Sequence, residues 1–295
     1  MTGAEQGFLL LTSHLGDPSR KPLTLAQFRE LTKRAWQMER PLEDRDLTAE
    51  DLMAIGCRPD FAWRVCGLME EKQRLCRYLE QAQSLDCFPI TRLHDLYPVR
   101  IKNKLDTESP GCLWAKGDLS ALTQPMIALV GSRQLHLQNR KFAYEVGKQA
   151  ALQGYTLVSG NATGADQEAQ NSCLEHGGMV VSVVADALGG HELQACVLYL
   201  SEEDFDQEFS AQRALSRNRI IHILGEKTFV AQCTMGKGGT WDGSLKNLRF
   251  GWSPLFCYND GSDAMDELLQ RGADAVQMET LSDISALKPS ILTMI

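Results

Sequence analysis

Two apolar segments, each followed at once by a turn of small residues, dominate residues 126–166. Met126 to Val130 lead into Gly131-Ser132-Arg133, and residues 156–159 lead into the turn Gly160 to Asp166. A polar segment suited to a helix separates the two. Such turns present backbone N–H groups and a helix N-terminus, which together hold an anion. The stretch therefore predicts an α/β fold that binds phosphate, either of a nucleotide or of a nucleic-acid backbone.

The chain is long enough for more than one domain. Its 295 residues exceed the usual size of a single domain. Helices are expected at 24–39, 49–55 and 59–84, with Thr24 and Thr48 as N-caps and Trp63 turned toward the core. We predict a helical N-terminal domain at 1–84, a Rossmann-like domain at 85–280 and a C-terminal tail at 281–295.

Strands and helices alternate after residue 85, which indicates βαβ units and a doubly wound, mostly parallel sheet. Strands are expected at 86–91, 112–115, 126–130, 156–159, 179–184, 228–231 and 255–257. Helices are expected at 137–153, 165–176, 212–224 and 245–250. Ligands bind beyond the carboxyl ends of the strands in such sheets. The turns 131–133, 160–166 and 236–244 should therefore meet at one rim.

Composition argues against several classes of protein. The net charge of −8 does not suit a general nucleic-acid coat, so any such binding must come from a local pocket. No apolar run approaches the roughly 20 residues that span a bilayer, and the N-terminus lacks a secretory pattern. The nine cysteines contain no Cys-x-x-Cys pair, and no two histidines have metal-ligand spacing. We expect a cytoplasmic protein with no metal, cofactor or membrane association.

Several short motifs are candidates for binding phosphate. Glycine permits close approach of the backbone, serine can donate a hydrogen bond, and arginine offers two donors to one phosphate. The alternative interpretation of Arg133 is an exposed residue on an ordinary turn between a strand and a helix, with no role in binding. The candidate residues are Gly131, Ser132, Arg133, Ser159, Gly160, Gly164, Asp166, Arg217, Asn218, Arg219, Lys237, Gly238, Gly239, Thr240, Gly243 and Ser244.

Some of these residues also have structural interpretations. Asp166 can cap the helix that it begins, or hold a ribose hydroxyl or a water. Arg217 and Arg219 need not point the same way, and the acidic segment 202–208 is an alternative partner for them. Residues 237–240 do not form the Walker pattern, and neither the Rossmann fingerprint nor a nucleophile elbow is present. We therefore expect no catalysis.

The order of the motifs resembles the DNA-processing protein A (DprA/Smf) family. The matching segments are Leu113 to Leu119, Gly131-Ser132-Arg133, Ser159 to Asp166, Arg217-Asn218-Arg219-Ile220-Ile221 and Gly243-Ser244-Leu245. The resemblance covers about 85–276 and, more loosely, 47–79. It implies an extended Rossmann-like fold, single-stranded DNA binding by a homodimer without nucleotide hydrolysis, and delivery of the strand to a RecA-type recombinase. Arg133 would be the main phosphate-gripping side chain.

The chain departs from the family pattern at several positions. Ala165 and Gln170 replace the usual Ile and His, the segment before Arg217 is acidic, and 258–261 stands where Pro-Gly is usual. The resemblance is thus to a divergent member, and a C-terminal winged helix is not expected. Two alternatives stay open: a nucleotide-binding sensor or scaffold in a mobile-element or phage-defence setting, and a nucleoside-monophosphate phosphoribohydrolase.

Overall fold

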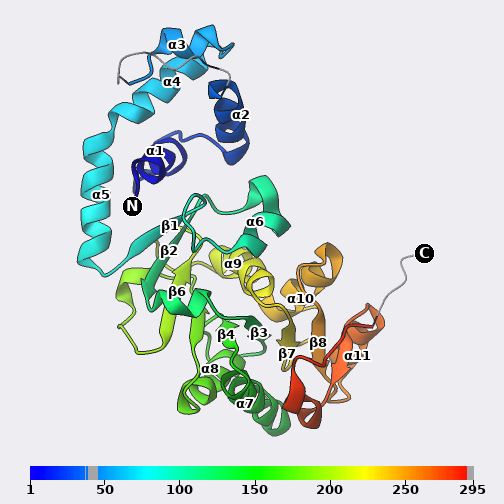
Figure 1. Ribbon diagram of the computed structural model, residues 1–295. Helices are drawn as coiled ribbons and strands as arrows, with labels where there is room; N and C mark the ends of the chain where they lie inside the picture. Colours follow the sequence, from blue (N-terminus) through cyan, green and yellow to red (C-terminus); the bar gives the residue numbers. More distant parts are fainter. Residues whose placement is uncertain (37, 39–45, 291–295) are drawn as a thin grey trace.

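The strands of the protein form one mixed sheet. A computed structural model describes residues 1–36, 38 and 46–290. Within them the strand order is β1-β2-β6-β5-β4-β3-β7-β8-β9 (Figure 1). The strands are β1 (Phe88–Thr91), β2 (Cys112–Gly117), β3 (Met126–Val130), β4 (Thr156–Ser159), β5 (Val180–Val183), β6 (Val197–Ser201), β7 (Thr228–Val230), β8 (Leu255–Tyr258) and β9 (Asp274–Val276). Only the β1–β2 and β2–β6 pairs are antiparallel within this sheet of described residues, so the prediction of a mostly parallel sheet is confirmed.

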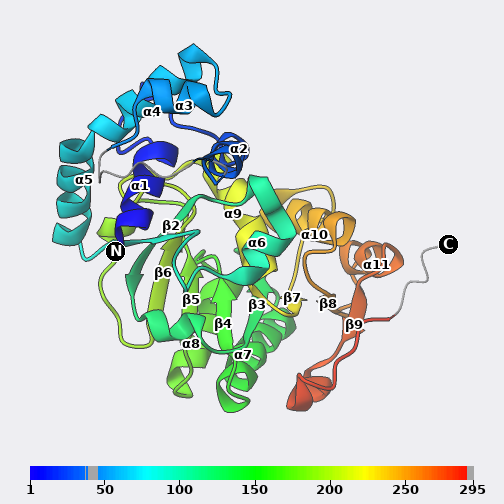
Figure 2. The same ribbon diagram turned by 45° about the horizontal axis from the view of Figure 1, so that its top comes forward.

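Helices cover both faces of the sheet (Figure 1 and Figure 2). They are α1 (Gly3–Thr12), α2 (Leu25–Ala35), α3 (Ala49–Ala54), α4 (Pro59–Glu70), α5 (Lys72–Ser84), α6 (Val99–Leu105), α7 (Leu137–Leu152), α8 (Ala165–Glu175), α9 (Ala211–Leu224), α10 (Gly238–Phe250) and α11 (Asp263–Gln270). Ile127 and Leu129 of β3 join the core under α7 and α8. Ala128 and Val130 join the opposite core, under α9 and α11. Because strand side chains alternate, a strand that is apolar throughout is buried only when helices cover both faces.

The strand order reverses beside β3, and this reversal creates the site. The chain runs from β3 outward through β4 and β5 to β6, then returns to the other side of β3 as β7 and continues to β8 and β9. At such a point the segments that leave two neighbouring strands diverge to opposite faces, which leaves a crevice beyond their carboxyl ends. Gly131 follows β3 and Ala231 follows β7. The crevice therefore opens between these two turns.

The N-terminal helices confirm two predicted caps and correct one predicted helix. Thr24 and Thr48 cap α2 and α3 through reciprocal capping boxes. The single helix predicted over 59–84 is wrong, because α4 ends at Glu70 and α5 starts at Lys72.

The side chain of Arg20 contacts the chain where the helix breaks. Its Nη2 donates to the carbonyl of Leu68 at 3.4 Å, and its Nε pairs with Glu71 at 3.2 Å. The Leu68 carbonyl also accepts from the Glu71 N–H at 3.4 Å, so Arg20 adds a second donor to the end of α4. Trp63 is also misplaced by the prediction: it lies 61% exposed, on the outer face of α4.

Other differences concern elements without a strong local pattern. Strands β6 and β9 and helices α6 and α11 were not predicted, and α10 begins at Gly238 instead of 245. Leu281 and Ile284 are buried in the main core, and both hydrogen-bond to Gln153 at the end of α7, so the start of the predicted tail packs onto the folded domain. Residues 37 and 39 of the helix predicted at 24–39, and residues 291–295 of the tail, lie outside the described residues. The division at 84 and 280 stays a prediction.

No helix among the described residues is long and apolar enough to cross a membrane.

Candidate functional site

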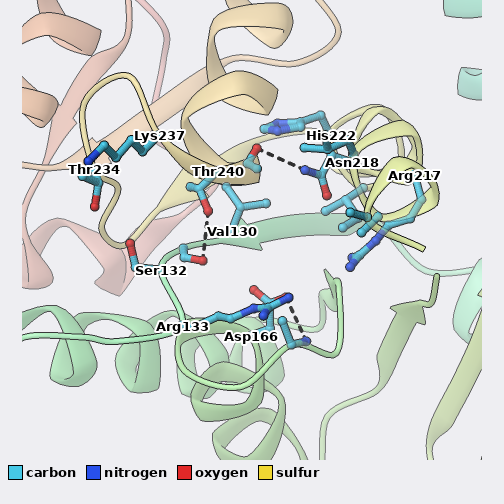
Figure 3. Close-up of a pocket in the computed structure, with 18 of the residues that line it drawn as sticks. Val130, Ser132, Arg133, Asp166, Arg217, Asn218, His222, Thr234, Lys237 and Thr240 are labelled. Carbon is cyan, nitrogen blue, oxygen red and sulfur yellow. Dashed lines mark hydrogen bonds between the residues drawn. The ribbon is translucent and has the colours of Figure 1, made fainter. Parts of the chain in front are cut away.

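A cavity of about 500 Å³ occupies the crevice where the strand order reverses (Figure 3). Residues from the turns after β3, β4 and β7 line it together with one side of α9 and the first turn of α10. The predicted residues that it brings together are Gly131, Ser132, Arg133, Asp166, Arg217, Asn218, Lys237, Gly238, Gly239 and Thr240. The expectation that three separate turns meet at one rim therefore holds in the structure.

Hydrogen bonds join the turns that form the cavity. The Ser132 N–H and hydroxyl both donate to the carbonyl of Gln232, at 2.9 and 3.2 Å. The Thr240 hydroxyl donates to the carbonyl of Gly131 at 2.9 Å, which ties α10 to the end of β3. The Ala165 N–H donates to the Ser132 carbonyl at 3.2 Å. These bonds give the Ser132 and Thr240 hydroxyls a structural role, and they fix the cavity wall in advance of any ligand.

The N-terminus of α10 supplies an anion-binding surface. Lys237 is the N-cap residue, and its side chain makes no capping hydrogen bond. Gly238, Gly239 and Thr240 form the first turn and line the cavity. The first N–H groups of a helix have no partner within it, and the helix dipole is positive at this end. The Asn218 amide donates to the Gly239 carbonyl at 3.1 Å and anchors this turn to α9 (Figure 3).

Arg217 is a buried cation pointed at the cavity. Figure 3 shows its guanidinium reaching from α9 toward Arg133 and Asp166. The residue is 8% exposed, and its Nε has no hydrogen-bond partner among the described residues. Burial lowers the pKa of Arg217, while the nearby Asp166 carboxylate raises it. A buried guanidinium with unused donors is suited to an anionic ligand.

Two glycines leave the space that this arrangement requires. At Gly160 a Cβ atom would lie 1.7 Å from Nη1 of Arg217, so only glycine leaves the guanidinium in place. At Gly164, with φ of +89°, a Cβ atom would lie 2.4 Å from the carbonyl oxygen of Arg133. Neither glycine lines the cavity itself. Both act by letting the turn after β4 approach its neighbours closely.

Asp166 is a buried carboxylate among the cationic groups. Its Oδ2 accepts from the N–H groups of Gly160 and Ala162 at 3.1 and 3.2 Å, so it stabilises the turn before its own helix. Burial raises the pKa of Asp166 to about 6, against the opposing effect of Arg217. The carboxylate therefore changes charge close to neutral pH, beside the two arginines that line the cavity.

Other predicted residues lie outside the cavity. Arg219 pairs with Glu202 at 2.9 Å on another face of α9, as the alternative interpretation of the acidic segment proposed. Ser159 is buried and accepts a hydrogen bond from Gln170. Gly243 and Ser244, predicted to precede a helix, lie within α10; they are buried there. Arg213, one turn before Arg217, pairs with Glu203 at 2.7 Å. Of these three arginines on α9, Arg217 is the one that lines the cavity.

Comparison with known proteins agrees with this architecture. A sequence model of the family described as DNA recombination-mediator protein A matches residues 89–286. The DNA processing protein DprA of Streptococcus pneumoniae is 30% identical over 247 residues, which cover 79% of this chain and 85% of the relative.

The chain belongs to the DNA recombination-mediator protein A family.

Other members extend the comparison. DprA of Bacillus subtilis is 28% identical over 218 residues, which cover 68% of this chain and 71% of the relative. The X-ray structure of S. pneumoniae DprA superimposes with a TM-score of 0.68 at 24% identity and covers 98% of this chain and 99% of that one. The structure of Helicobacter pylori DNA processing protein A, described by its single-stranded DNA binding mode, gives a TM-score of 0.57 at 22% identity over 66% of this chain and 94% of that one. The chain is thus a DNA-processing protein with the fold of this family.

Sequence reasoning missed the apolar part of the cavity of this family member. Phe209, Leu215 and Ile221 line it, and Phe209 and Leu215 are 57% and 44% exposed. Exposed apolar residues on a polar helix or in the segment before it are a weak signal in a sequence. His222 also lines the cavity; burial lowers its pKa to about 3, so the ring is neutral at physiological pH. The cavity therefore combines cationic groups with a largely apolar wall.

Proposed function

We propose that this DNA-processing protein binds single-stranded DNA through the cavity between β3 and β7, without catalysis. The observation that carries the proposal is the convergence of Arg133, Arg217 and the N-terminus of α10 on one cavity in a chain of net charge −8. Charge-assisted hydrogen bonds from guanidinium and N–H groups hold a phosphate. The apolar wall with Phe209 suits the face of a base.

The partners of the bound strand are part of the same proposal. The matched family is described as a recombination mediator, which supports delivery of the strand to a RecA-type recombinase. We also propose a homodimer in the cytoplasm, as the family resemblance implies. Light scattering of the purified protein tests the dimer. Recombinase filament formation on strands coated with this protein tests the delivery, and filaments that form no faster than without it would contradict that step.

Binding to DNA is tested with a salt titration. Fluorescence anisotropy of a labelled single strand is compared with duplex DNA and with free nucleotides at several salt concentrations. Affinity for the single strand should be highest and should fall as salt rises, because phosphate contacts release counterions. Arg133→Ala should weaken binding by about 1–3 kcal/mol, the range for losing a charge-assisted hydrogen bond.

Arg140→Ala provides the matched control. Arg140 is an exposed arginine on α7 that pairs with Glu168 at 3.2 Å and does not line the cavity. Equal affinity of wild type and Arg133→Ala for every ligand would reject the site. Preference for a free nucleotide over all DNA would instead favour a nucleotide sensor, and release of free base would favour a phosphoribohydrolase.

A further inference from the structure

A second cavity adjoins the first along helix α9. Its volume is about 520 Å³, and Leu215 and Asn218 line both cavities. Residues of α10, of α6 and of the turn after α6 complete its wall. The two cavities therefore share part of one wall, and a ligand in the first lies beside the second.

The second cavity has an aromatic wall that is held in place. Phe250 is 56% exposed and lines the cavity, and Leu215 is 44% exposed on the neighbouring helix. The Phe250 ring stacks on Trp252, with centroids 5.5 Å apart and planes 19° from parallel. The Arg249 guanidinium lies 5.2 Å from the Phe250 centroid, and Arg249 does not line the cavity. A ring fixed in this way loses little freedom when a further ring packs on it.

The charges around the second cavity suit a polyanion. Lys104, Arg219 and Lys246 line it, against the acidic residues Asp106 and Glu108. Asp106 is already paired with an arginine of α2 at 3.0 Å, and Arg219 is held by its carboxylate partner. Lys246 pairs with a half-exposed aspartate of its own helix at 2.7 Å. Exposed pairs of this kind are weak, so a phosphate can take the place of that carboxylate.

We propose that the second cavity binds the next part of the same DNA strand, with a base stacked at Phe250 and a phosphate at Lys246. The inference rests on the proposed function, because a phosphate held by Arg217 brings the strand to Leu215. Every base has an aromatic face, so stacking at Phe250 tolerates any sequence. The protein then reads the length of a strand, since only a strand that reaches past Leu215 gains this contact.

Strand length is the variable that tests the inference. Affinities are measured by anisotropy for two oligothymidylates, one shorter than and one within the roughly 4–16 nucleotides that single-strand-binding modules cover. Phe250→Ala should weaken binding of the long strand roughly tenfold and leave the short strand within about twofold of wild type. Phe250→Trp should retain long-strand affinity, and Lys246→Gln should weaken it. Trp63→Ala, which removes an exposed aromatic residue from α4, is the control.

The outcomes separate this inference from the proposed function. If Arg133→Ala weakens both strands while Phe250→Ala changes neither, the first cavity binds DNA and the second does not. If wild type binds no strand, the proposed function fails as well. The same face could instead be a contact between two copies of the chain, and light scattering on Phe250→Ala tests this alternative. A change of oligomeric state that accounts for the lost affinity would overturn the inference.

Discussion

Replacing Gly160 by alanine moves the Arg217 guanidinium without removing it. The new Cβ atom would lie 1.7 Å from Nη1 and 2.6 Å from Cζ of Arg217. Non-bonded carbon atoms sit about 3.5–4.0 Å apart at their optimum. The guanidinium must therefore shift by about 2 Å, which takes its donors out of reach of a phosphate in the cavity. Gly160 is not among the residues with positive φ, so the backbone itself accepts alanine.

The loss of affinity follows from that displacement. A hydrogen bond to a charged group contributes about 1.5–3 kcal/mol. Its loss corresponds to about a 10- to 150-fold rise in Kd. The obstructing atoms belong to the end of a flexible side chain, so the free energy of unfolding should change by less than about 1 kcal/mol. Gly160→Ala should therefore bind DNA nearly as weakly as Arg217→Ala while its Tm stays close to that of wild type.

Fluorescence anisotropy and thermal unfolding, measured on the same preparations, test whether the position of the Arg217 guanidinium sets the affinity for DNA. Gly190→Ala is the control, because its Cβ atom would meet no other atom within 4 Å. If Gly160→Ala keeps wild-type affinity while Arg217→Ala loses it, the position of the guanidinium is not what matters and the reasoning is refuted. A cooperative unfolding transition at a much lower temperature would equally refute it, since the argument requires an intact fold.

Three further predictions concern charge and packing. Burial raises the pKa of Asp166 to about 6, so between about pH 4 and 6 the native state holds a proton that the unfolded chain has lost. The free energy of unfolding should therefore fall by roughly 3 kcal/mol as pH rises through this window. Urea titrations at several pH values should show this fall in wild type and not in Asp166→Asn. Arg219→Ala leaves the Glu202 side chain, 6% exposed, without its cation, so chemical denaturation should show a loss of about 2 kcal/mol; an unchanged free energy of unfolding would contradict the role of this pair. In Gly147→Ala the new Cβ atom would lie 2.0 Å from the backbone carbonyl oxygen of Ala169, which cannot move aside as a side chain can. The free energy of unfolding, measured by chemical denaturation, should therefore fall by about 3 kcal/mol or more. An unchanged unfolding midpoint would contradict the tight packing of α7 on α8.

Much of the fold follows from local patterns. The bounds predicted for β3 and β4 agree with the structure, because each is a short apolar run closed by small residues. Strand β6 was missed because the alternation of strands and helices along the chain leads one to expect a helix after β5. A 3-10 turn at Leu188–Gly190 connects β5 to β6 instead. Helix α10 was started too late because Gly238 and Gly239 read as a turn, and only their place beyond β7 makes them its first turn.

The candidate site was predictable in part for the same reason. Glycine-rich turns such as that at Gly164 are local features, and the rule for parallel sheets places them at one rim without knowledge of the strand order. The apolar wall was not predictable, since Phe209 and Leu215 look like ordinary surface residues until α9 is placed over the crevice. The contact of Glu71, at the break between α4 and α5, with Arg20 was likewise not predictable, because Arg20 is distant in sequence.

The sequence by itself determined the alternation of strands and helices, the turns that carry backbone donors, and the resemblance to the recombination-mediator family, because these depend on periodicity and on conformations available to single residues. Tertiary structure alone decided which cation serves the cavity. Arg219 lies on another face of α9 and pairs with the acidic segment. Arg213 lies on the same face as Arg217, one turn earlier, and is equally buried, but its guanidinium donates to the Ala185 carbonyl and pairs with Glu203. Of the three, Arg217 is the one that lines the cavity. A helix fixes the angles among its own side chains, while its rotation about its axis is set by what it buries.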